Sequence, residues 1–175
     1  MKWTTRQLTT MALLTAIALA IHVAEAQIPP LVAIPGVKLG LANIVTVYVA
    51  FTIGGGAAAM ILIARILLGS MFGGGVVSLL YSLAGGLLCL LVTLCLRRML
   101  STRQIWVAGV MGAIAHNIGQ ILVAVVVTGT PAIVSYLPVL LISGVITGTF
   151  TGYAAQAVVN RLGSRQHQTK DKKDD

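Results

Sequence analysis

Seven polar or charged residues draw attention because they lie inside or beside strongly apolar segments. Ionisable groups within a bilayer cost about 2.5–3.5 kcal/mol each on insertion scales, so they generally bind a ligand, move a proton or pair with one another. Cations, one carboxylate and several amides together are suited to holding a small polar solute. We therefore take as candidate substrate-binding residues Glu25, Lys38, Asn43, Arg65, His116, Asn117 and Gln120.

Two other interpretations of these residues stay open. In the first, Glu25 and Arg65 form a structural ion pair, and the polar residues at 116–120 join helices through hydrogen bonds of about 0.6 kcal/mol each. In the second, His22, Glu25 and His116 relay protons. For the binding interpretation, Lys38 and Arg65 against Glu25 leave one surplus positive charge, which slightly favours an anionic or zwitterionic ligand.

Other chemistry finds little support in the sequence. There is no glycine-rich phosphate loop, so the chain cannot itself hydrolyse ATP, and there is no Ser/His/Asp grouping. All three aspartates lie in the tail, so no carboxylate cluster is available for Mg²⁺ and a diphosphate. Cys89 and Cys95 lie in one apolar run and are expected to be buried thiols. We expect no catalytic residue, no metal site and no cofactor.

The composition predicts an all-α integral membrane protein. Of 175 residues, 57% are hydrophobic and 9% are charged, whereas about a quarter of a soluble domain is charged. Apolar runs long enough to cross a hydrocarbon core of about 30 Å recur along the chain. We expect a compact bundle of about six transmembrane helices, at 8–26, 40–53, 57–71, 76–96, 105–127 and 132–160.

Glycine and proline mark the breaks between these segments. Gly54–Gly56 and Gly73–Gly75 interrupt the apolar pattern, as does the turn at 129–131. Residues 1–160 form a single transmembrane domain. The charged tail, 161–175, has almost no apolar residues and is expected to be disordered and cytoplasmic.

The basic residues indicate the topology. They cluster at the N-terminus, at 97–103 and in the tail, and Lys and Arg in short loops mark the cytoplasmic side. We expect a multi-pass protein of the cell membrane, surrounded by membrane lipid, with both termini cytoplasmic. No basic stripe is interleaved with aromatic residues, so a nucleic-acid partner is not expected. As an alternative, Ala24–Gln27 matches a signal-peptide cleavage site.

This topology brings the candidate residues to a common depth. Residues 27–39 contain Pro29, Pro30, Pro35 and Gly36, cannot continue a helix, and form an outer loop that could act as a lid. At about 1.5 Å per residue, Glu25 and Asn43 lie near the outer surface, Arg65 lies in the outer half, His116 near the midplane and Gln120 one turn further out. A small-molecule site open to the outside follows.

Small residues form two further patterns at intervals of four. Such faces let helices approach closely. One comprises Ala12, Ala16 and Ala20, and the other comprises Gly144, Gly148 and Gly152. Each could either pack within the chain or dock a separate membrane subunit.

Two motifs resemble those of a known family. They are Pro-Gly-Val-Lys-Leu-Gly-Leu-Ala-Asn-Ile at 35–44 and Gly-Ala-Ile-Ala-His-Asn-Ile-Gly-Gln at 112–120, accompanied by Glu25, Pro29-Pro30 and Arg65. Together they resemble the Gx transporter family, often labelled heptaprenyl diphosphate synthase component I, over roughly residues 8–160. That family is similar to the substrate-binding S components of energy-coupling factor (ECF) transporters.

The resemblance implies a six-helix bundle with a solute site near its outer face, covered by the first loop. The Ala12/Ala16/Ala20 face would dock on the ECF coupling subunit, and two ATPase subunits would hydrolyse ATP. The aspartate-rich motif of prenyl transferases is missing, so we do not expect an enzyme. The solute would be a vitamin, a precursor, or a prenylated or quinone-type compound. The alternative is a non-transport accessory protein of isoprenoid or quinone synthesis.

Overall fold

The protein is a bundle of helices. The computed structural model describes residues 3–28 and 38–174, with only the backbone of 73–74 and 163–174. The elements are α1 (Thr5–Glu25), α2 (Asn43–Thr52), α3 (Gly55–Gly69), the π-helical turn η1 (Ser70–Gly74), α4 (Gly75–Arg97), α5 (Ile105–Thr128), the 3₁₀ helix η2 (Pro131–Tyr136) and α6 (Leu137–Asp174). The described residues include no strand, which confirms the all-α fold.

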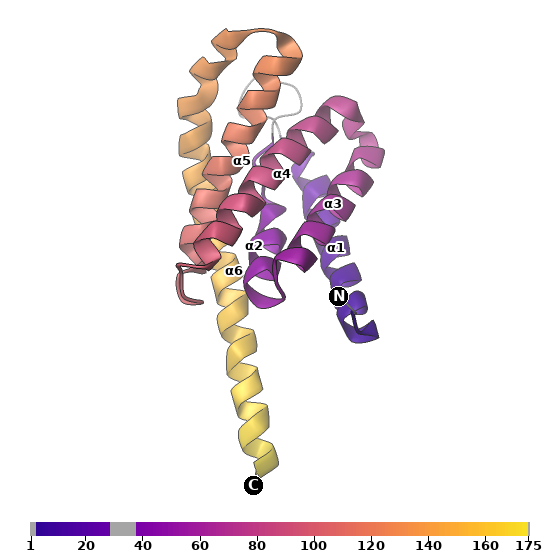
Figure 1. Ribbon diagram of the computed structural model, residues 1–175, viewed down its shortest axis with the longest axis vertical. Coiled ribbons are helices and arrows are strands. Elements are labelled where there is room, and N and C mark those ends of the chain that lie inside the picture. Colours follow the sequence, from indigo (N-terminus) through magenta and orange to yellow (C-terminus); the bar gives the residue numbers. More distant parts are fainter. Residues whose placement is uncertain (1–2, 29–37, 175) are drawn as a thin grey trace.

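Five of the described helices are long and apolar enough to cross a membrane: α1, α3, α4, α5 and α6, with η1 and η2 extending α3 and α6. Large side chains such as Met71, Val126 and Phe150 are more than two-thirds exposed, as expected of surfaces that face lipid. The two ends of the described chain lie at the same end of the bundle (Figure 1). This arrangement agrees with the expected multi-pass architecture.

The predicted second span, 40–53, is shorter than expected. Helix α2 has ten residues and extends about 15 Å, half of a hydrocarbon core. It cannot begin earlier because Gly40 has φ +79°, outside the helical region. It ends before Gly54, whose φ is +134°. The six predicted segments are therefore five full-length helices and one half-length helix.

The predicted breaks fall where a backbone with positive φ stops each helix. Gly54, Gly75 and Gly129 all have positive φ, which favours glycine. Between α3 and α4 the chain also forms the π-helical turn η1. The hydrophobic runs between these glycines form the helices, so the predicted boundaries of α4 and α5 agree with the structure to within one residue.

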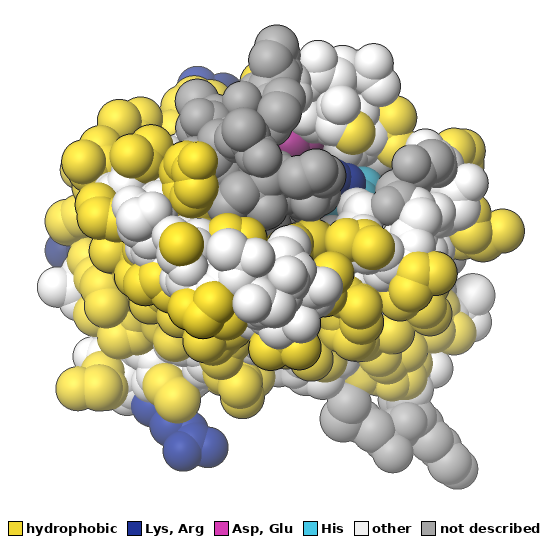
Figure 2. Space-filling view, turned by 90° about the horizontal axis from the view of Figure 1, so that it is seen from above, with side chains coloured by type: hydrophobic (Ala, Val, Ile, Leu, Met, Phe, Trp, Pro, Cys, Tyr) yellow, Lys and Arg dark blue, Asp and Glu magenta, His cyan; other side chains and the backbone are white. Residues whose placement is uncertain are grey.

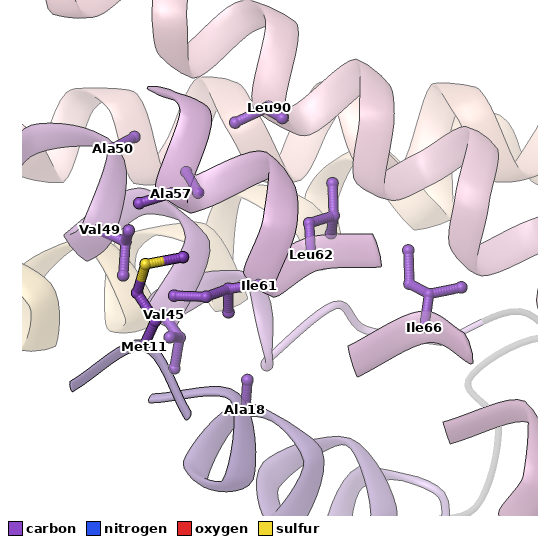
Figure 3. Close-up of a cluster of buried hydrophobic side chains, with 11 residues drawn as sticks. Met11, Ala18, Val45, Val49, Ala50, Ala57, Ile61, Leu62, Ile66 and Leu90 are labelled. Carbon is purple, nitrogen blue, oxygen red and sulfur yellow. The ribbon is translucent and has the colours of Figure 1, made fainter. Parts of the chain in front are cut away.

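One apolar cluster holds α1, α2, α3 and α4 together (Figure 3). The cluster includes Met11 and Ala18 of α1 together with the buried Ala57, Ala58 and Ile61 of α3. Small side chains let the helices approach closely, so van der Waals contact can hold helices together where lipid removes the hydrophobic driving force. This cluster packs the inner face of α1 against the rest of the bundle.

Helices α5 and α6 pack with almost no side chain between them. A Cβ on Gly109 would lie 2.5 Å from Gly152 Cα, and a Cβ on Gly148 would lie 2.7 Å from Val110 Cα. A Cβ on Gly144 would lie 2.6 Å from Asn117 Nδ2. The second small-residue pattern therefore packs within the chain, and the alternative of a docking face is wrong for it.

The charged tail is helical. Helix α6 continues to Asp174 (Figure 1), whereas the sequence led us to expect disorder from residue 161. Beyond Gly163 half of the twelve residues are Lys, Gln or Arg, and none is glycine or proline. These residues have high helix propensity, and an existing helix extends at little cost because its nucleus is already formed.

Gln156 of α6 caps the N-terminus of α5 through hydrogen bonds. Its Oε1 accepts a hydrogen bond from the buried Ile105 N–H at 2.8 Å, and its Nε2 donates to the Thr102 carbonyl at 2.5 Å. Gln156→Ala should lower the free energy of unfolding by about 1–3 kcal/mol, because it leaves a buried N–H unpaired. Thermal unfolding in detergent measures the loss. The control Gln104→Ala removes an exposed side-chain amide whose oxygen accepts only from the Ser101 N–H and hydroxyl, both at 3.4 Å. An equal loss in the control would contradict the role of Gln156.

Candidate functional site

Residues 38–42, which immediately precede α2 in the sequence, lie inside the bundle. Lys38 contacts Gln120, which lies eight residues before the end of α5, or about 12 Å below it. Residues 38–42 are not helical, and non-helical backbone at membrane depth must be buried in protein or line a cavity. We call residues 38–42 the re-entrant segment. It carries Lys38 and leads into α2 at Asn43.

Gln120 binds the peptide group of Lys38 on both sides. Its amide nitrogen, Nε2, donates to the Lys38 carbonyl at 2.9 Å. Its amide oxygen accepts from the Lys38 N–H and from His116 Nε2, both at 3.1 Å. The amide orientation is assigned from these partners; the opposite one keeps only a 3.4 Å contact to the Lys38 N–H. Gln120 is fully buried, so it binds the backbone of the re-entrant segment away from lipid.

Helix α1 holds the same segment from the other side. The carboxylate of Glu25 accepts a hydrogen bond from the Gly40 N–H at 2.5 Å. The Lys38 Nζ lies 3.0 Å from His22 Nε2. Both α1 residues are 5% exposed and lie on the inner face of the helix. The re-entrant segment is therefore fixed by α1 and α5 together.

Arg65 and Asn43 form a second pair beneath the segment. Arg65 Nη2 donates to Asn43 Oδ1 at 3.2 Å, and both side chains are at most 5% exposed. Arg65 Nε and Asn43 Nδ2 have no hydrogen-bond partner among the described residues, and the same holds for His116 Nδ1. Buried polar atoms usually find partners. Thr93 Oγ1 and Asn117 Oδ1 are also unpartnered among the described residues, so it is the grouping of the first three near the re-entrant segment that makes a candidate ligand site.

Asn117 is directed elsewhere. Its Nδ2 donates to the Leu140 carbonyl of α6 at 2.5 Å. This bond joins α5 to α6, as the helix-joining interpretation expects. The other six candidate residues lie around the re-entrant segment and the start of α2.

Glu25 and Arg65 share no hydrogen bond among the described side chains. Their charges act on each other only at longer range. Glu25 binds a backbone N–H instead, and Arg65 binds an amide. Burial lowers the pKa of Lys38, and the nearby Glu25 partly opposes this effect. The structural ion pair of Glu25 and Arg65 therefore stays a prediction, with the two charges interacting at longer range.

Three glycines make room for the two buried imidazoles, a role that the sequence pattern did not reveal. A Cβ on Gly40 would lie 2.8 Å from His116 Cδ2, and one on Gly85 would lie 2.6 Å from His116 Nδ1. A Cβ on Gly69 would lie 2.7 Å from His22 Cδ2. Only Gly40 belonged to a recognised motif. Gly85 and Gly69 lie among many other glycines of an apolar chain, so nothing in the sequence distinguished them.

The expected lid is only partly described. Pro29, Pro30, Pro35 and Gly36 lie outside the described residues, and of the outer-loop residues singled out only Lys38 is placed. Seen from the end opposite the termini, acidic, basic and histidine side chains are visible together near the middle of a largely hydrophobic surface (Figure 2). Charged and histidine side chains are therefore grouped at this end of the bundle.

The first small-residue face is exposed. Ala12, Ala16 and Ala20 all lie on the outer surface of α1. The buried residues of this helix, Met11, Ala18, His22 and Glu25, lie on its other side. One helix therefore contributes to the polar site on its inner face and presents an alanine surface on its outer face.

The cysteines give no indication of a metal site. Cys89 is buried, as expected, but Cys95 is exposed, and both are free thiols. Cys95 is exposed because it lies on the outward side of α4, which the hydropathy of its neighbours could not reveal. Among the described residues no three His, Cys, Asp or Glu side chains are grouped so that they could hold a metal ion.

The comparison with known families agrees with the two motifs. The family model described as heptaprenyl diphosphate synthase component I matches residues 14–158. The chain belongs to this family. The match includes Glu25, the re-entrant segment, Arg65 and the 112–120 motif, so every candidate substrate-binding residue of this family member lies within it. No curated protein and no solved structure matches the chain significantly.

Proposed function

We propose that this member of the heptaprenyl diphosphate synthase component I family is the membrane-embedded substrate-binding subunit of an ECF-type transporter. It captures a small solute, such as a vitamin, a precursor, or a prenylated or quinone-type compound. The solute enters from the outer face, opposite the cytoplasmic termini. The protein lies in the cell membrane and is not an enzyme.

One observation carries this proposal. Polar groups of α1, α2, α3 and α5 converge inside an otherwise apolar bundle, and three of their buried atoms have no partner in the described part of the chain. Structural polar groups in membranes commonly bond one another. A cluster that keeps two spare donors and a spare ring nitrogen suits a ligand site, and intramembrane ionisable residues are functional by default.

We assign the outer face of α1 to a coupling partner. Ala12, Ala16 and Ala20 form an exposed strip on which a helix of an ECF coupling subunit can lie closely. Two ATPase subunits on the cytoplasmic side hydrolyse ATP, since the chain has no nucleotide motif of its own. The remaining outer surface faces membrane lipid.

A second function is favoured by the description of the family. In that case the protein is a non-transport accessory of isoprenoid or quinone synthesis. Deletion would then change the level of lipid quinones and leave solute uptake intact. The transport proposal expects the reverse, so a deletion strain assayed for both separates the two functions.

Native mass spectrometry tests ligand binding directly. The protein is purified from its own membranes in a mild detergent and sprayed with any small molecule it retains. We expect one class of bound compound in stoichiometric amount. Protein that carries no small molecule, and that none of the extracted membrane metabolites stabilises, would count against a solute site.

The docking face is tested by Ala16→Trp. A bulky side chain on the exposed alanine strip should abolish solute uptake, because it keeps the partner helix away, while ligand retention and thermal stability stay unchanged. The matched control is Ile17→Trp, at the adjacent exposed position, where a large side chain already stands. Uptake that survives Ala16→Trp, or is lost equally in both variants, would remove this face from the mechanism.

A further inference from the structure

The buried cation Arg65 makes no hydrogen bond to a carboxylate among the described side chains, and Glu25 acts on it only through longer-range charge. Its side chain is 3% exposed, its Nη2 donates to the neutral Asn43, and its Nε has no hydrogen-bond partner among the described residues. A charge buried without a partner costs several kcal/mol. Such a charge persists in a membrane only where it serves a purpose.

The chain itself offers no spare carboxylate for this cation. Its acidic residues are Glu25, Asp171, Asp174 and Asp175, so residues 29–37 contain none and three belong to the tail. The carboxylate of Glu25 accepts from the Gly40 N–H and shares no hydrogen bond with Arg65 among the described side chains. Lys38 adds a further cation, whose Nζ contacts an imidazole. The site therefore carries one more positive than negative charge.

Two spare donors lie on residues that are bonded to each other. Arg65 Nε and Asn43 Nδ2 both lack partners, while Arg65 Nη2 and Asn43 Oδ1 hold the two side chains together at 3.2 Å. A carboxylate has two oxygens that accept several hydrogen bonds, and charge-assisted bonds from a guanidinium are the strong ones. A carboxylate is therefore the chemical group that matches these two donors.

Resting on the function proposed above, we propose that the substrate carries a single carboxylate, which binds Arg65 Nε and Asn43 Nδ2, and that prenyl diphosphates do not bind. One carboxylate balances the one surplus positive charge. A diphosphate brings more negative charge than the site can balance, and the excess would be buried without a partner. The site therefore selects against the compound class in the family description.

The variant Arg65→Gln tests the charge. Its amide can still bond Asn43 but carries no charge, so we expect ligand-free protein to unfold at a higher temperature than the unsubstituted protein. Retained ligand should fall by at least about tenfold, the effect of losing a charge-assisted hydrogen bond. Arg65→Lys, which keeps the charge, should recover part of the binding. A lower unfolding temperature for ligand-free Arg65→Gln would make Arg65 a structural group and overturn the inference.

The ligand itself gives the second test. Small molecules extracted from protein purified from its own membranes are identified by mass spectrometry, and geranyl diphosphate is added to ligand-free protein as a probe. A retained carboxylic acid, with no shift by geranyl diphosphate, supports the inference. A retained neutral or cationic compound, or stabilisation by geranyl diphosphate, overturns it and leaves the transport function standing. No retained compound of any class counts against both.

A lipid phosphate is the other source of negative charge. Ligand-free protein is therefore compared in nanodiscs of phosphatidylcholine alone and with phosphatidylglycerol added. We expect the unfolding temperature to change equally for the unsubstituted protein and Arg65→Gln. An anionic lipid that stabilises only the protein with Arg65 would assign the site to a headgroup and overturn the carboxylate.

Discussion

Gly40→Ala is expected to abolish ligand binding and to destabilise the bundle by about 2–5 kcal/mol. Gly40 has φ +79°, where a Cβ costs about 1–2 kcal/mol. That Cβ would also lie 2.8 Å from His116 Cδ2 and 2.9 Å from Asn43 Nδ2, and overpacking typically adds about 1–3 kcal/mol. Since both neighbours are buried site residues, relief of the clash displaces the site.

The control for this variant isolates the effect of the backbone. Gly129 has φ +64°, and a Cβ there would meet nothing within 4 Å. Gly129→Ala should therefore show only the conformational loss and keep full binding. Thermal unfolding and native mass spectrometry of both variants measure the difference. Equal stability losses, with ligand retained in both, would mean that the close approach of Gly40 to His116 is unimportant.

Gly152→Leu is expected to prevent the protein from folding. A Cβ at this position would lie 2.6 Å from the Trp106 carbonyl oxygen and 2.8 Å from Trp106 Cα. These are backbone atoms, which cannot rotate away as a flexible side chain can. Helices α5 and α6 would have to separate, and we expect a loss above about 3 kcal/mol. Because α5 carries His116 and Gln120, the site would be lost with the packing.

An exposed position on the same helix provides the control. Ala157 lies on the outer surface of α6, so Ala157→Leu adds the same side chain where it can face lipid. We expect a change within about 0.5 kcal/mol for it. The fraction of each variant that elutes as a single species from size-exclusion chromatography in detergent measures folding. Normal yield of Gly152→Leu would contradict the backbone contact between α5 and α6.

The positions of the long helices were predictable because their causes are local. An apolar run of about 20 residues has one stable state in a bilayer, and glycine and proline end it. Helix α4 was expected at 76–96 and extends over Gly75–Arg97. The tail was the exception. Its low hydrophobicity means that it cannot form a core of its own, but this does not prevent it from extending α6.

Helix α2 could not be predicted because what shortens it is not local. The residues that follow Gly40 are Leu41 and Ala42, which are good helix formers. The segment stays non-helical where Glu25 binds the Gly40 N–H and Gln120 binds the peptide of Lys38. These partners lie 15 and 82 residues away in the sequence. Tertiary contacts therefore override the local preference.

The sequence by itself determined the class of protein, the identity of the polar residues and the surplus positive charge, because composition, hydropathy and the count of carboxylates need no coordinates. Only the tertiary structure decided the partners: Glu25 binds a backbone N–H, and Arg65 binds Asn43. It also decided that the Ala12/Ala16/Ala20 face is exposed and that Gly148 packs against α5. The physical reason is that hydrogen bonds and close packing depend on distances between residues far apart in the chain, which neither spacing nor composition contains.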